Sequence, residues 1–414
     1  MKAEIIAVGS ELLTPFRLDT NSLYLTAELN KLGIELVRKC VVGDHADQLR
    51  EAFREALGRS QLVIGMGGLG PTEDDLTRET VAELLGRKLV RNDSVLQAIQ
   101  ERFRRFGRQM PETNARQAMV PEGAALLENQ RGTAPGLWIE SSDRLIILLP
   151  GPPAELKSMF AELVRGRLEK LSRGVWLVTR ELRVACMPES QVDARIAPLY
   201  KGAPGIETTI LASPGEIQIH LRAWAGNTAA AEKALDELAE KICQELGEVV
   251  FTLRGESLEV VVAAALKEAR ATVAVAESCT GGLLAERLTT VPGSSNYFLG
   301  GVVCYSNHLK NAWVEVPAEL IEARGAVSSE VAQALAEGIR RRAGATLGLG
   351  ITGIAGPGGG TPEKPVGTVH VALASEGAMY ERRFTFPGDR DIVRWQASQM
   401  ALDFVRRYFT GRGK

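Results

Sequence analysis

The sequence is poor in histidine and cysteine, and the few that occur are dispersed. Its 414 residues include only four histidines and five cysteines, and no two cysteines have the C-x-x-C spacing of a structural zinc site. The odd number and the scatter also argue against a disulfide framework and fit a reducing compartment. Because clustered histidines are missing, we expect any catalysis to rest on carboxylates, hydroxyls, a lysine or a bound metal.

Long apolar runs and an excess of basic charge are absent as well. No stretch approaches the roughly 18 apolar residues of a membrane span, and Glu4 and Glu11 interrupt what would be the apolar core of a signal peptide. We therefore expect a soluble, unprocessed, cytoplasmic protein without a membrane partner. Lys+Arg 49 against Asp+Glu 51 leave a formal net charge of -2, so general nucleic-acid binding is not expected.

Short β-branched apolar segments dominate the first part of the chain. They have the pattern of strands buried on both faces of a parallel sheet, and helical leucine repeats separate the first three. The segments are residues 3–8, 35–42, 61–66 and 144–149. The sequence PGPP at 150–153 then separates the last strand from a helical stretch at 154–171. We predict an α/β domain with a parallel sheet over residues 1–172.

The pattern changes over residues 173–252, which we predict to be a small α+β module. A strand pair flanks Ser213-Pro214-Gly215, and a helix is expected over 229–246. The order β-α-β-β-α is that of compact KH-like modules, some of which bind RNA, but the segment has no GxxG loop and no exposed aromatic pair. A spacer or dimerisation role is therefore the expectation. A third domain, 253–414, begins near Gly255 with an amphipathic helix that leads into the strand 272–276.

The strand 272–276 runs directly into the sequence ESCTGG (277–282) and then into LLAERL. This succession of strand, tight turn and helix predicts that Ser278 lies at a helix N-terminus. Unpaired amides and the helix dipole can stabilise an anion there, including the oxyanion that forms when a hydroxyl attacks an amide carbonyl. A simple Ser or Thr N-cap before a glycine turn would give the same pattern.

A second apolar strand, 300–306, ends in the polar cluster YSNHLK (305–310). Strand ends are where α/β folds assemble their active sites. A partly desolvated Lys310 would have a pKa shifted toward neutrality and could then take the proton of a serine. His308 could equally be the base, and a solvated surface lysine is the alternative for Lys310.

A glycine-rich loop, TGIAGPGGG (352–360), follows the apolar strand 346–351. Backbone amides in such loops cradle phosphate, although a flexible glycine-rich hairpin has a similar composition. Near the end of the chain, PGDRD (387–391) opens the last helix and offers Arg390 for a bidentate phosphate contact. A capping turn with an exposed arginine is the alternative.

The first domain has its own glycine loop, GGLGPTEDD (67–75), after the strand 61–66. Its glycines can bring the backbone close to phosphate, and an acidic pair can hold Mg²⁺ or Mn²⁺ on a diphosphate. Asp74 or Asp75 could instead cap the helix that follows. Asp44, after the second strand, could supply a further carboxylate.

Four motifs in the last domain carry a family resemblance. AESCTGG, YSNHLK, TGIAGPGGG with EKPVGT, and GDRD, in that order over residues 255–414, resemble the CinA C-terminal domain, the nicotinamide mononucleotide deamidase family. The resemblance implies a serine amidohydrolase without a cofactor, in which Ser278 is the nucleophile, Lys310 its base and Tyr305 their neighbour. The substrate-binding residues that it implies are Thr280, Gly281, Thr352, Gly353, Ala355, Gly356, Pro357 and Arg390.

The first domain resembles the molybdopterin-binding fold and, with GSELL, DTNS and LPGPPAEL, is closer still to the CinA N-terminal domain. Leu69 stands where the molybdenum-cofactor enzymes usually carry threonine. The CinA resemblance implies a metal-dependent ADP-ribose pyrophosphatase. Its divalent cation would be held by Asp44, Asp75 and Asp74, and its substrate by Gly67, Gly68, Gly70 and Thr72.

Together the two resemblances predict a homodimeric enzyme of pyridine nucleotide recycling. It would release ammonia from nicotinamide mononucleotide at the C-terminal site and cleave ADP-ribose to AMP and ribose 5-phosphate at the N-terminal site. The competing hypothesis is a non-enzymatic nucleotide-binding sensor or scaffold connected with competence or DNA damage.

Overall fold

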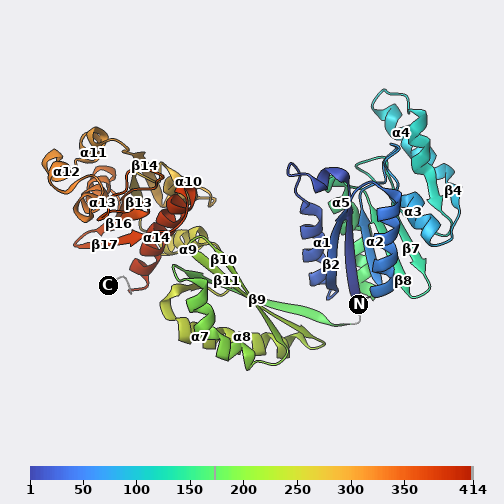
Figure 1. Cartoon of the computed structure of the whole chain (residues 1–414), viewed down its shortest axis with the longest axis horizontal. Helices are drawn as coiled ribbons and strands as arrows, with labels where there is room; N and C mark the ends of the chain where they lie inside the picture. The colour runs from blue at the N-terminus through green and yellow to red at the C-terminus, as the bar shows by residue number, and fades with distance from the viewer. Residues whose placement is uncertain (172–173, 412–414) are drawn as a thin grey trace. The chain divides into compact units, whose positions relative to one another are not determined.

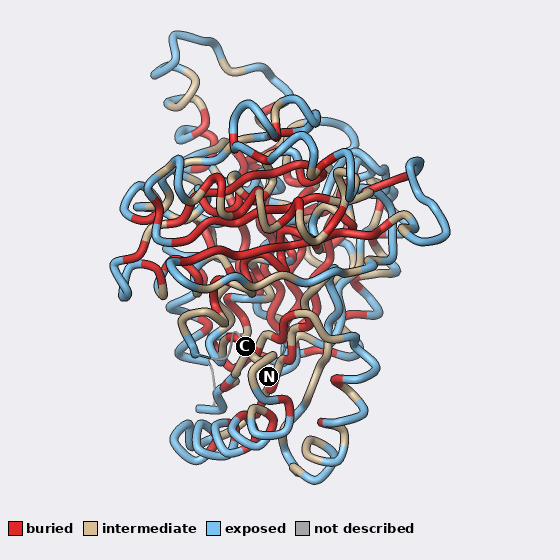
Figure 2. The backbone as a smooth tube through the Cα atoms, turned by 90° about the vertical axis from the view of Figure 1, so that its left-hand side faces the viewer, coloured by how far each residue is buried: buried red, intermediate tan, exposed pale blue. Residues whose placement is uncertain are grey.

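The computed structural model describes residues 1–171 and 174–411. The chain divides into two compact units, one formed by Met1–Val178 with Trp224–Ala231 and the other by Thr179–Ala223 with Glu232–Lys414 (Figure 1). In each unit the buried residues follow the central strands and the helix sides that face them (Figure 2). The α/β fold class with a parallel-sheet first domain, a small middle module and an α/β last domain is confirmed.

The first unit is built on a six-stranded sheet with the order β2-β1-β3-β8-β7-β6. Its first four strands are parallel, and they are the four that the sequence predicts: β2 (Glu35–Val42), β1 (Lys2–Val8), β3 (Leu62–Met66) and β8 (Arg144–Leu149). The antiparallel strands β7 (Gly136–Ser141) and β6 (Ala125–Leu127) complete the sheet.

Helices cover both faces of this sheet because neighbouring strand residues point to opposite sides. Ile5 packs in a core with α1 (Thr20–Lys31) and with the helical segment α5 (Pro153–Met159), η3 (Phe160–Val164) and α6 (Arg165–Leu171). Ile6 packs in the opposite core with α2 (Ala46–Arg59) and α3 (Thr77–Leu84). The helix predicted over 154–171 is confirmed, with a π-helical turn in its middle.

The segment between α3 and β6 forms a small lobe for which the sequence shows no clear pattern. It contains β4 (Leu89–Arg91), α4 (Asp93–Arg105), the 3₁₀ helix η2 (Glu112–Ala118) and β5 (Met119–Pro121). The two strands pair with each other as a separate antiparallel ribbon. Strands of three residues are too short to show alternation, so their absence from the sequence-based prediction is expected.

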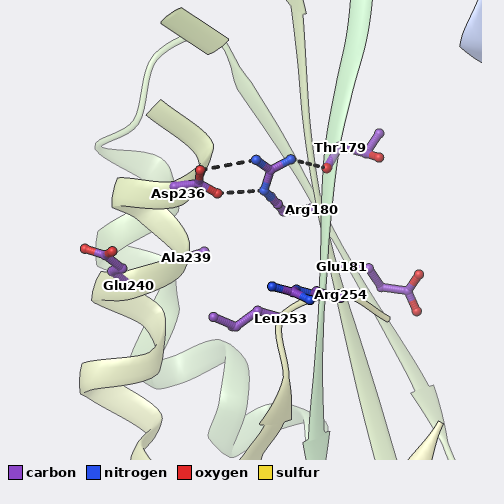
Figure 3. Close-up of a pocket in the computed structure, with 8 residues that line it drawn as sticks. All are labelled: Thr179, Arg180, Glu181, Asp236, Ala239, Glu240, Leu253 and Arg254. Carbon is purple, nitrogen blue, oxygen red and sulfur yellow. Dashed lines mark hydrogen bonds and ion pairs between the residues drawn. The ribbon is translucent and has the colours of Figure 1, made fainter. Parts of the chain in front are cut away.

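The middle module is a four-stranded sheet with the order β10-β11-β9-β12. Its elements are β9 (Trp176–Ala185), α7 (Glu189–Lys201), β10 (Ile206–Ser213), β11 (Glu216–Ala225), α8 (Thr228–Leu246) and β12 (Val250–Thr252). The predicted β-α-β-β-α order is present, with β12 added at one edge. Figure 3 shows a crevice in this module, across which Arg180 Nε contacts Asp236 Oδ1 at 2.6 Å.

The last domain has a five-stranded sheet with the order β14-β13-β15-β16-β17. Strands β14 (Phe298–Val303), β13 (Val273–Glu277) and β15 (Leu347–Gly353) are parallel, whereas β16 (Thr368–Ser375) and β17 (Ala378–Thr385) are antiparallel. The strand predicted over 300–306 begins two residues earlier and ends three residues earlier, so residues 304–306 already belong to the loop after it.

Two helical layers cover this sheet. One contains α9 (Leu258–Glu268), α10 (Leu283–Thr289) and α14 (Arg390–Phe409), which pack on Val273 and Val275. The other contains α11 (Asn307–Val314), α12 (Ala318–Arg324) and α13 (Ser329–Ala343), which pack on Ala274 and Ala276. The parallel strands therefore lie between helices, with their carboxyl ends at one edge.

All five cysteines are free thiols. Across residues 1–171 and 174–411, no helix combines the length and the apolar character needed to cross a membrane.

Candidate active sites at two sheet edges

Three loops of the last domain start side by side at the carboxyl ends of β13, β14 and β15. In the sheet register, Glu277 lies opposite both Val303 and Ile351. The amide of Ser278 donates to Ile351 O at 3.0 Å, and the amide of Cys304 donates to Glu277 O at 2.9 Å. The three polar motifs are therefore brought to one edge, as expected for parallel strands.

Ser278 lies before the helix and not at its N-terminus. Helix α10 begins at Leu283. Its N-cap is Gly282, which has no side chain to cap the helix. Both Gly281 (φ 62) and Gly282 (φ 96) are left-handed, so they add a turn between the strand and the helix. The predicted position of Ser278 at the helix N-terminus is wrong, and so is the alternative that a Ser or Thr in this segment caps the helix.

The carboxylate of Glu277 occupies the helix N-terminus instead. This side chain is 1% exposed and accepts hydrogen bonds from the amides of Gly282 (3.1 Å), Leu284 (3.1 Å) and Ala285 (2.8 Å). These helix N-terminal amides are the ones that the sequence analysis expects to stabilise an oxyanion. Among the described residues, the amide of Thr280 has no acceptor and the amide of Cys279 interacts only with its own thiol, which leaves these two as candidate donors for a developing oxyanion.

Lys310 is buried in the first turn of α11, at 1% exposure. Its Nζ donates to the carbonyl of Tyr305 at 3.0 Å, and no described carboxylate forms an ion pair with it. Burial lowers the pKa of Lys310 below its usual value, with small opposing effects from the thiols of Cys304 and Cys279. The alternative of a solvated surface lysine is therefore wrong. His308, on the same helix, is exposed.

Cys279 is next to Ser278 but is a poor nucleophile. Complete burial, and secondarily the charge of Glu277, raises the pKa of the Cys279 thiol to about 12. Because the thiolate and not the thiol is the reactive species, this cysteine stays inert near neutral pH. The hydroxyls of Ser278 and Thr280 remain in this turn, and Ser278, at 7% exposure against 0% for Thr280, is the more accessible of the two.

Arg390 connects the glycine loop with the loop that follows β14. Its Nη1 donates to Gly356 O at 2.8 Å, and its Nη2 donates to Tyr305 Oη at 3.1 Å. Arg390 is exposed and opens α14, whose N-cap is Asp389. Thr352 is turned elsewhere: its buried hydroxyl donates to Ala326 O at 2.7 Å.

The remaining sequence-predicted residues of this site lie at the end of β15, in the glycine loop and in the turn after β13. Gly353 ends β15, and Ala355, Gly356 and Pro357 follow in the glycine loop, where Gly356 has a left-handed φ of 86. Thr280 is fully buried, and its hydroxyl has no partner among the described residues.

Arg394 is a further residue of this site that the sequence analysis missed. It lies one helical turn after Arg390 and donates to the carbonyl of Thr280 from Nε (3.2 Å) and Nη2 (3.0 Å). The i, i+4 spacing of the two arginines on the last helix places them on one face. That spacing was a usable signal, but nothing in the sequence showed what this face contacts.

The first unit brings its own loops together at the carboxyl ends of β1, β2 and β3. Gly67 and Gly68 are left-handed, with φ values of 99 and 65, and a Cβ on Gly67 would lie 2.2 Å from Val8 O. Only glycine fits there, which explains the close approach of this loop to the loop after β1. Asp44 Oδ2 accepts from the amide of Ser10 at 2.7 Å.

Asp75 closes the glycine loop on itself. Its Oδ2 accepts from the amide of Thr72 at 2.9 Å and also from the Thr72 hydroxyl. A Cβ on Gly70 would lie 2.4 Å from this carboxylate. Asp74 is exposed. The N-cap of α3 is Leu76, with no side-chain cap, so the alternative that Asp74 or Asp75 caps this helix is wrong.

The structure does not preassemble a metal centre from these aspartates. Within residues 1–171 and 174–411, no group of three or more His, Cys, Asp or Glu side chains is placed to hold an ion. Asp44 and Asp75 each use one oxygen within the chain, which leaves the other available. A cation at this edge would need substrate oxygens and water to complete its coordination, which is common for Mg²⁺.

Buried polar atoms without a partner surround this glycine loop. They include Thr77 Oγ1, Arg78 Nε and Asn21 Oδ1. The Thr77 hydroxyl lies against Gly68, and Asn21 Nδ2 donates at 2.7 Å to the carbonyl of Gly151, which is adjacent to Gly67. Unpaired buried polar groups are costly, so their concentration here fits a ligand-binding edge.

Arg116 is the second functional residue that the sequence analysis missed. From the 3₁₀ helix η2, its Nη1 donates to Thr72 O at 2.8 Å, and its Nε donates to Glu79 Oε1 at 2.8 Å. It therefore fixes the acidic end of the glycine loop. No motif or period marks this position.

Three family models match consecutive parts of the chain. They are the "Probable molybdopterin binding domain" over residues 4–170, the "Damage-inducible protein CinA KH domain" over 179–252 and the "CinA C-terminal domain" over 255–409. The chain is thus a protein with a molybdopterin-binding-type domain, a KH-type module and a CinA C-terminal domain.

Two relatives match this chain over nearly its whole length. A "CinA-like protein" of Koribacter versatilis is 52% identical over 413 residues, which cover 98% of this chain and 99% of that protein. A "CinA-like protein" of Solibacter usitatus is 51% identical over 412 residues and covers 100% and 99%. This chain belongs to the CinA family. A solved CinA superfamily protein from Klebsiella pneumoniae is 34% identical, covers 37% of this chain and 96% of its own, and has a TM-score of 0.36.

The geometry of Glu277 leads to a stability prediction. Glu277→Gln should lower the free energy of unfolding of the second unit by about 2 kcal/mol, because buried amides lose a charged acceptor. Urea unfolding of the full chain measures this change. Glu286→Gln, the same change at an exposed position of the same helix, should alter it by less than about 0.5 kcal/mol. Equal effects of the two substitutions would contradict the capping role.

Proposed function

We propose that the C-terminal site hydrolyses the carboxamide of nicotinamide mononucleotide to the carboxylate, with release of ammonia. The observation that carries this proposal is Lys310, a fully buried lysine without a carboxylate partner at the same sheet edge as Ser278. A lysine that is easily neutral can act as a base, and a serine needs such a base to become a nucleophile.

The reaction divides into two acyl-transfer steps. Ser278 Oγ attacks the carboxamide carbon while its proton passes to Lys310 Nζ, and the oxyanion is stabilised by the amides of Cys279 and Thr280. Lys310 then returns the proton to the leaving nitrogen, which departs as ammonia and leaves an ester on Ser278. Water, deprotonated by Lys310, attacks the ester and regenerates the serine with its proton.

The nucleotide part of the substrate is assigned to the neighbouring loops. Arg390 is exposed, and its guanidinium is held by Gly356 O and Tyr305 Oη. In this position it can present donors to the phosphate group alongside the glycine-loop amides. Holding the phosphate at one point and the carboxamide at another would orient the scissile bond.

For the first unit we propose cleavage of the diphosphate of ADP-ribose to AMP and ribose 5-phosphate. Support comes from the left-handed Gly67 and Gly68, the free oxygens of Asp44 and Asp75, and the unpaired buried polar atoms around the loop. Asp44 and Asp75 would hold a divalent cation, which supplies charge neutralisation on the diphosphate when bound. Arg116 keeps Thr72 and Asp75 in place for this task.

The nucleophile is tested by Ser278→Ala. Ammonia release from nicotinamide mononucleotide should fall to below about 1% of the wild-type rate, because the covalent step is lost. The melting temperature and ADP-ribose cleavage should not change, since no structural hydrogen bond of the Ser278 hydroxyl is lost. Activity that survives in this variant would assign the attack to water. A wild-type protein that releases no ammonia would instead favour the nucleotide-sensor hypothesis.

The base is tested by Lys310→Arg and by the pH profile. Arginine stays protonated at any practical pH, so Lys310→Arg should be as inactive as Lys310→Ala. His308→Ala is the matched control and should retain activity. Because burial lowers the Lys310 pKa from its usual 10.5, and the neutral amine is the active form, the rate should rise with pH and level off below pH 10.5. Loss of activity in His308→Ala alone would replace the Ser/Lys pair by Ser/His.

The metal is tested by chelation. EDTA or Asp75→Asn should reduce ADP-ribose cleavage by at least about a hundredfold, because charge on the diphosphate is no longer neutralised. Deamidation should be unchanged, since its proposed site uses no metal. Glu73→Gln, a neighbouring exposed carboxylate in the same loop, is the matched control and should cleave normally. Full ADP-ribose cleavage in excess EDTA would leave Asp75 as a purely structural residue of the loop.

A further inference from the structure

The middle module is attached to the last domain through its β10–β11 turn. Gly215 in this turn is left-handed (φ 75), and a Cβ there would lie 3.2 Å from Cγ of Gln399 on α14. The turn therefore reaches the side chains of α14 directly. The next residue, Glu216, accepts from Gln399 Nε2 at 3.1 Å through its Oε2.

This contact continues into the last domain as a chain of hydrogen bonds. Gln399 is 1% exposed, and its Oε1 accepts from Nη2 of Arg287 on α10 at 2.5 Å. Arg287 is 3% exposed and also donates to Ser398 Oγ at 2.7 Å and to Glu259 Oε1 at 2.7 Å. Its guanidinium carbon lies 4.2 Å from the centre of the Trp395 ring. Each of the three guanidinium nitrogens of this arginine thus donates one hydrogen bond.

The position of α10 depends on this arginine. The helix has only seven residues, and an isolated helix of that length is unstable in water. Tertiary contacts must therefore hold it in place: Leu284 and Leu288 in the core, Glu277 at its N-terminus and the Arg287 network near its C-terminus. Because the serine turn, 278–282, runs directly into α10, any shift of this helix moves the turn.

Trp395 adds a second connection between the network and the serine turn. It stacks on Arg287 and is the immediate neighbour of Arg394, which donates to the carbonyl of Thr280. The network therefore fixes both helices that hold the turn, α10 directly and α14 through its Arg394–Ser398 segment.

On this basis we infer that the middle module is a positioning element of the serine site, and that Glu216 is its positioning residue. The inference rests on the proposed deamidation for its kinetic consequence but not for its structural one. Glu216 touches no reacting atom; it orients Gln399, which orients Arg287 near the end of α10 and so the position of this short helix.

The principal variant is Glu216→Ala in the full-length chain. Two measurements apply: hydrogen exchange of the amides of Gly282, Leu284 and Ala285, and the steady-state kinetics of ammonia release from nicotinamide mononucleotide. We expect faster exchange at these amides and a kcat lower by between about twofold and thirtyfold. KM should be unchanged, because the substrate contacts are intact. Gln399→Met, which keeps the side-chain volume, should give the same result.

Two further variants separate positioning from general stability. Glu216→Gln keeps an oxygen that can accept from Gln399 but loses the ion pair of Glu216 Oε1 with Arg183. Recovery of exchange and kcat toward wild-type values in this variant would therefore attribute the effect to the Gln399 contact and not to the Arg183 pair. Asp236→Ala breaks the Arg180 ion pair in the same module (Figure 3) and should affect neither measurement. If Asp236→Ala lowers kcat equally, the effect comes from destabilising the module, and the inference is wrong.

The remaining outcomes also decide the question. Unchanged exchange at residues 282–285 in both Glu216→Ala and Gln399→Met would overturn the inference. Faster exchange with an unchanged kcat would show that the network has only a structural role, and this result would overturn the inference as well. If the wild-type protein releases no ammonia, the proposed deamidation fails, whereas the exchange measurement still decides whether the middle module positions the serine turn.

Discussion

The buried carboxylate of Glu277 is the constraint on which the serine site depends. Removing a carboxylate from water is costly unless its oxygens are well hydrogen-bonded, and here three backbone amides at the start of α10 meet that requirement. The same amides would otherwise be the unpaired donors of a helix N-terminus. This one interaction therefore gives the amides at the helix N-terminus an acceptor, compensates the burial of the charge and fixes the turn. Arg394 holds the turn from the other side through the Thr280 carbonyl, so the backbone between the two contacts has little freedom.

This arrangement also determines the charges around Ser278. The Glu277 carboxylate is saturated by amides and forms no ion pair with Lys310, so the lysine is buried without a neutralising partner, and its pKa is lowered. The thiol of Cys279 is affected in the opposite sense, because burial and the nearby carboxylate both raise its pKa. Burial therefore shifts the lysine toward its neutral form and the thiol away from the thiolate at the same edge of the sheet. That combination fits a serine nucleophile with a lysine base.

Particular elements show where sequence reasoning succeeded and why it stopped. The parallel strands were predictable because strands buried on both faces are nearly continuous apolar runs, and their polar ends located Ser278, Tyr305 and Lys310, whereas Arg390 was located by the turn that opens the last helix. The start of α10 was not predictable, because two left-handed glycines add a turn that the pattern of strand, turn and helix does not reveal. Arg116 and Arg394 were missed for a related reason. Their importance lies in backbone carbonyls that they contact far away in the sequence, and a carbonyl leaves no signature in the residue letters.

The sequence suggested a spacer or dimerisation unit between the two outer domains, and the contacts of α14 add a connection that neither of these roles includes. One helix contacts the glycine loop through Arg390, the serine turn through Arg394, α10 through Trp395 and Ser398, and the middle module through Gln399. These side chains span less than three helical turns, so they are held rigidly relative to one another. A displacement of the β10–β11 turn would consequently be felt at the serine turn, through α10 and Arg394. The contacts of α14 thus support the inference that the middle module helps to position the serine turn.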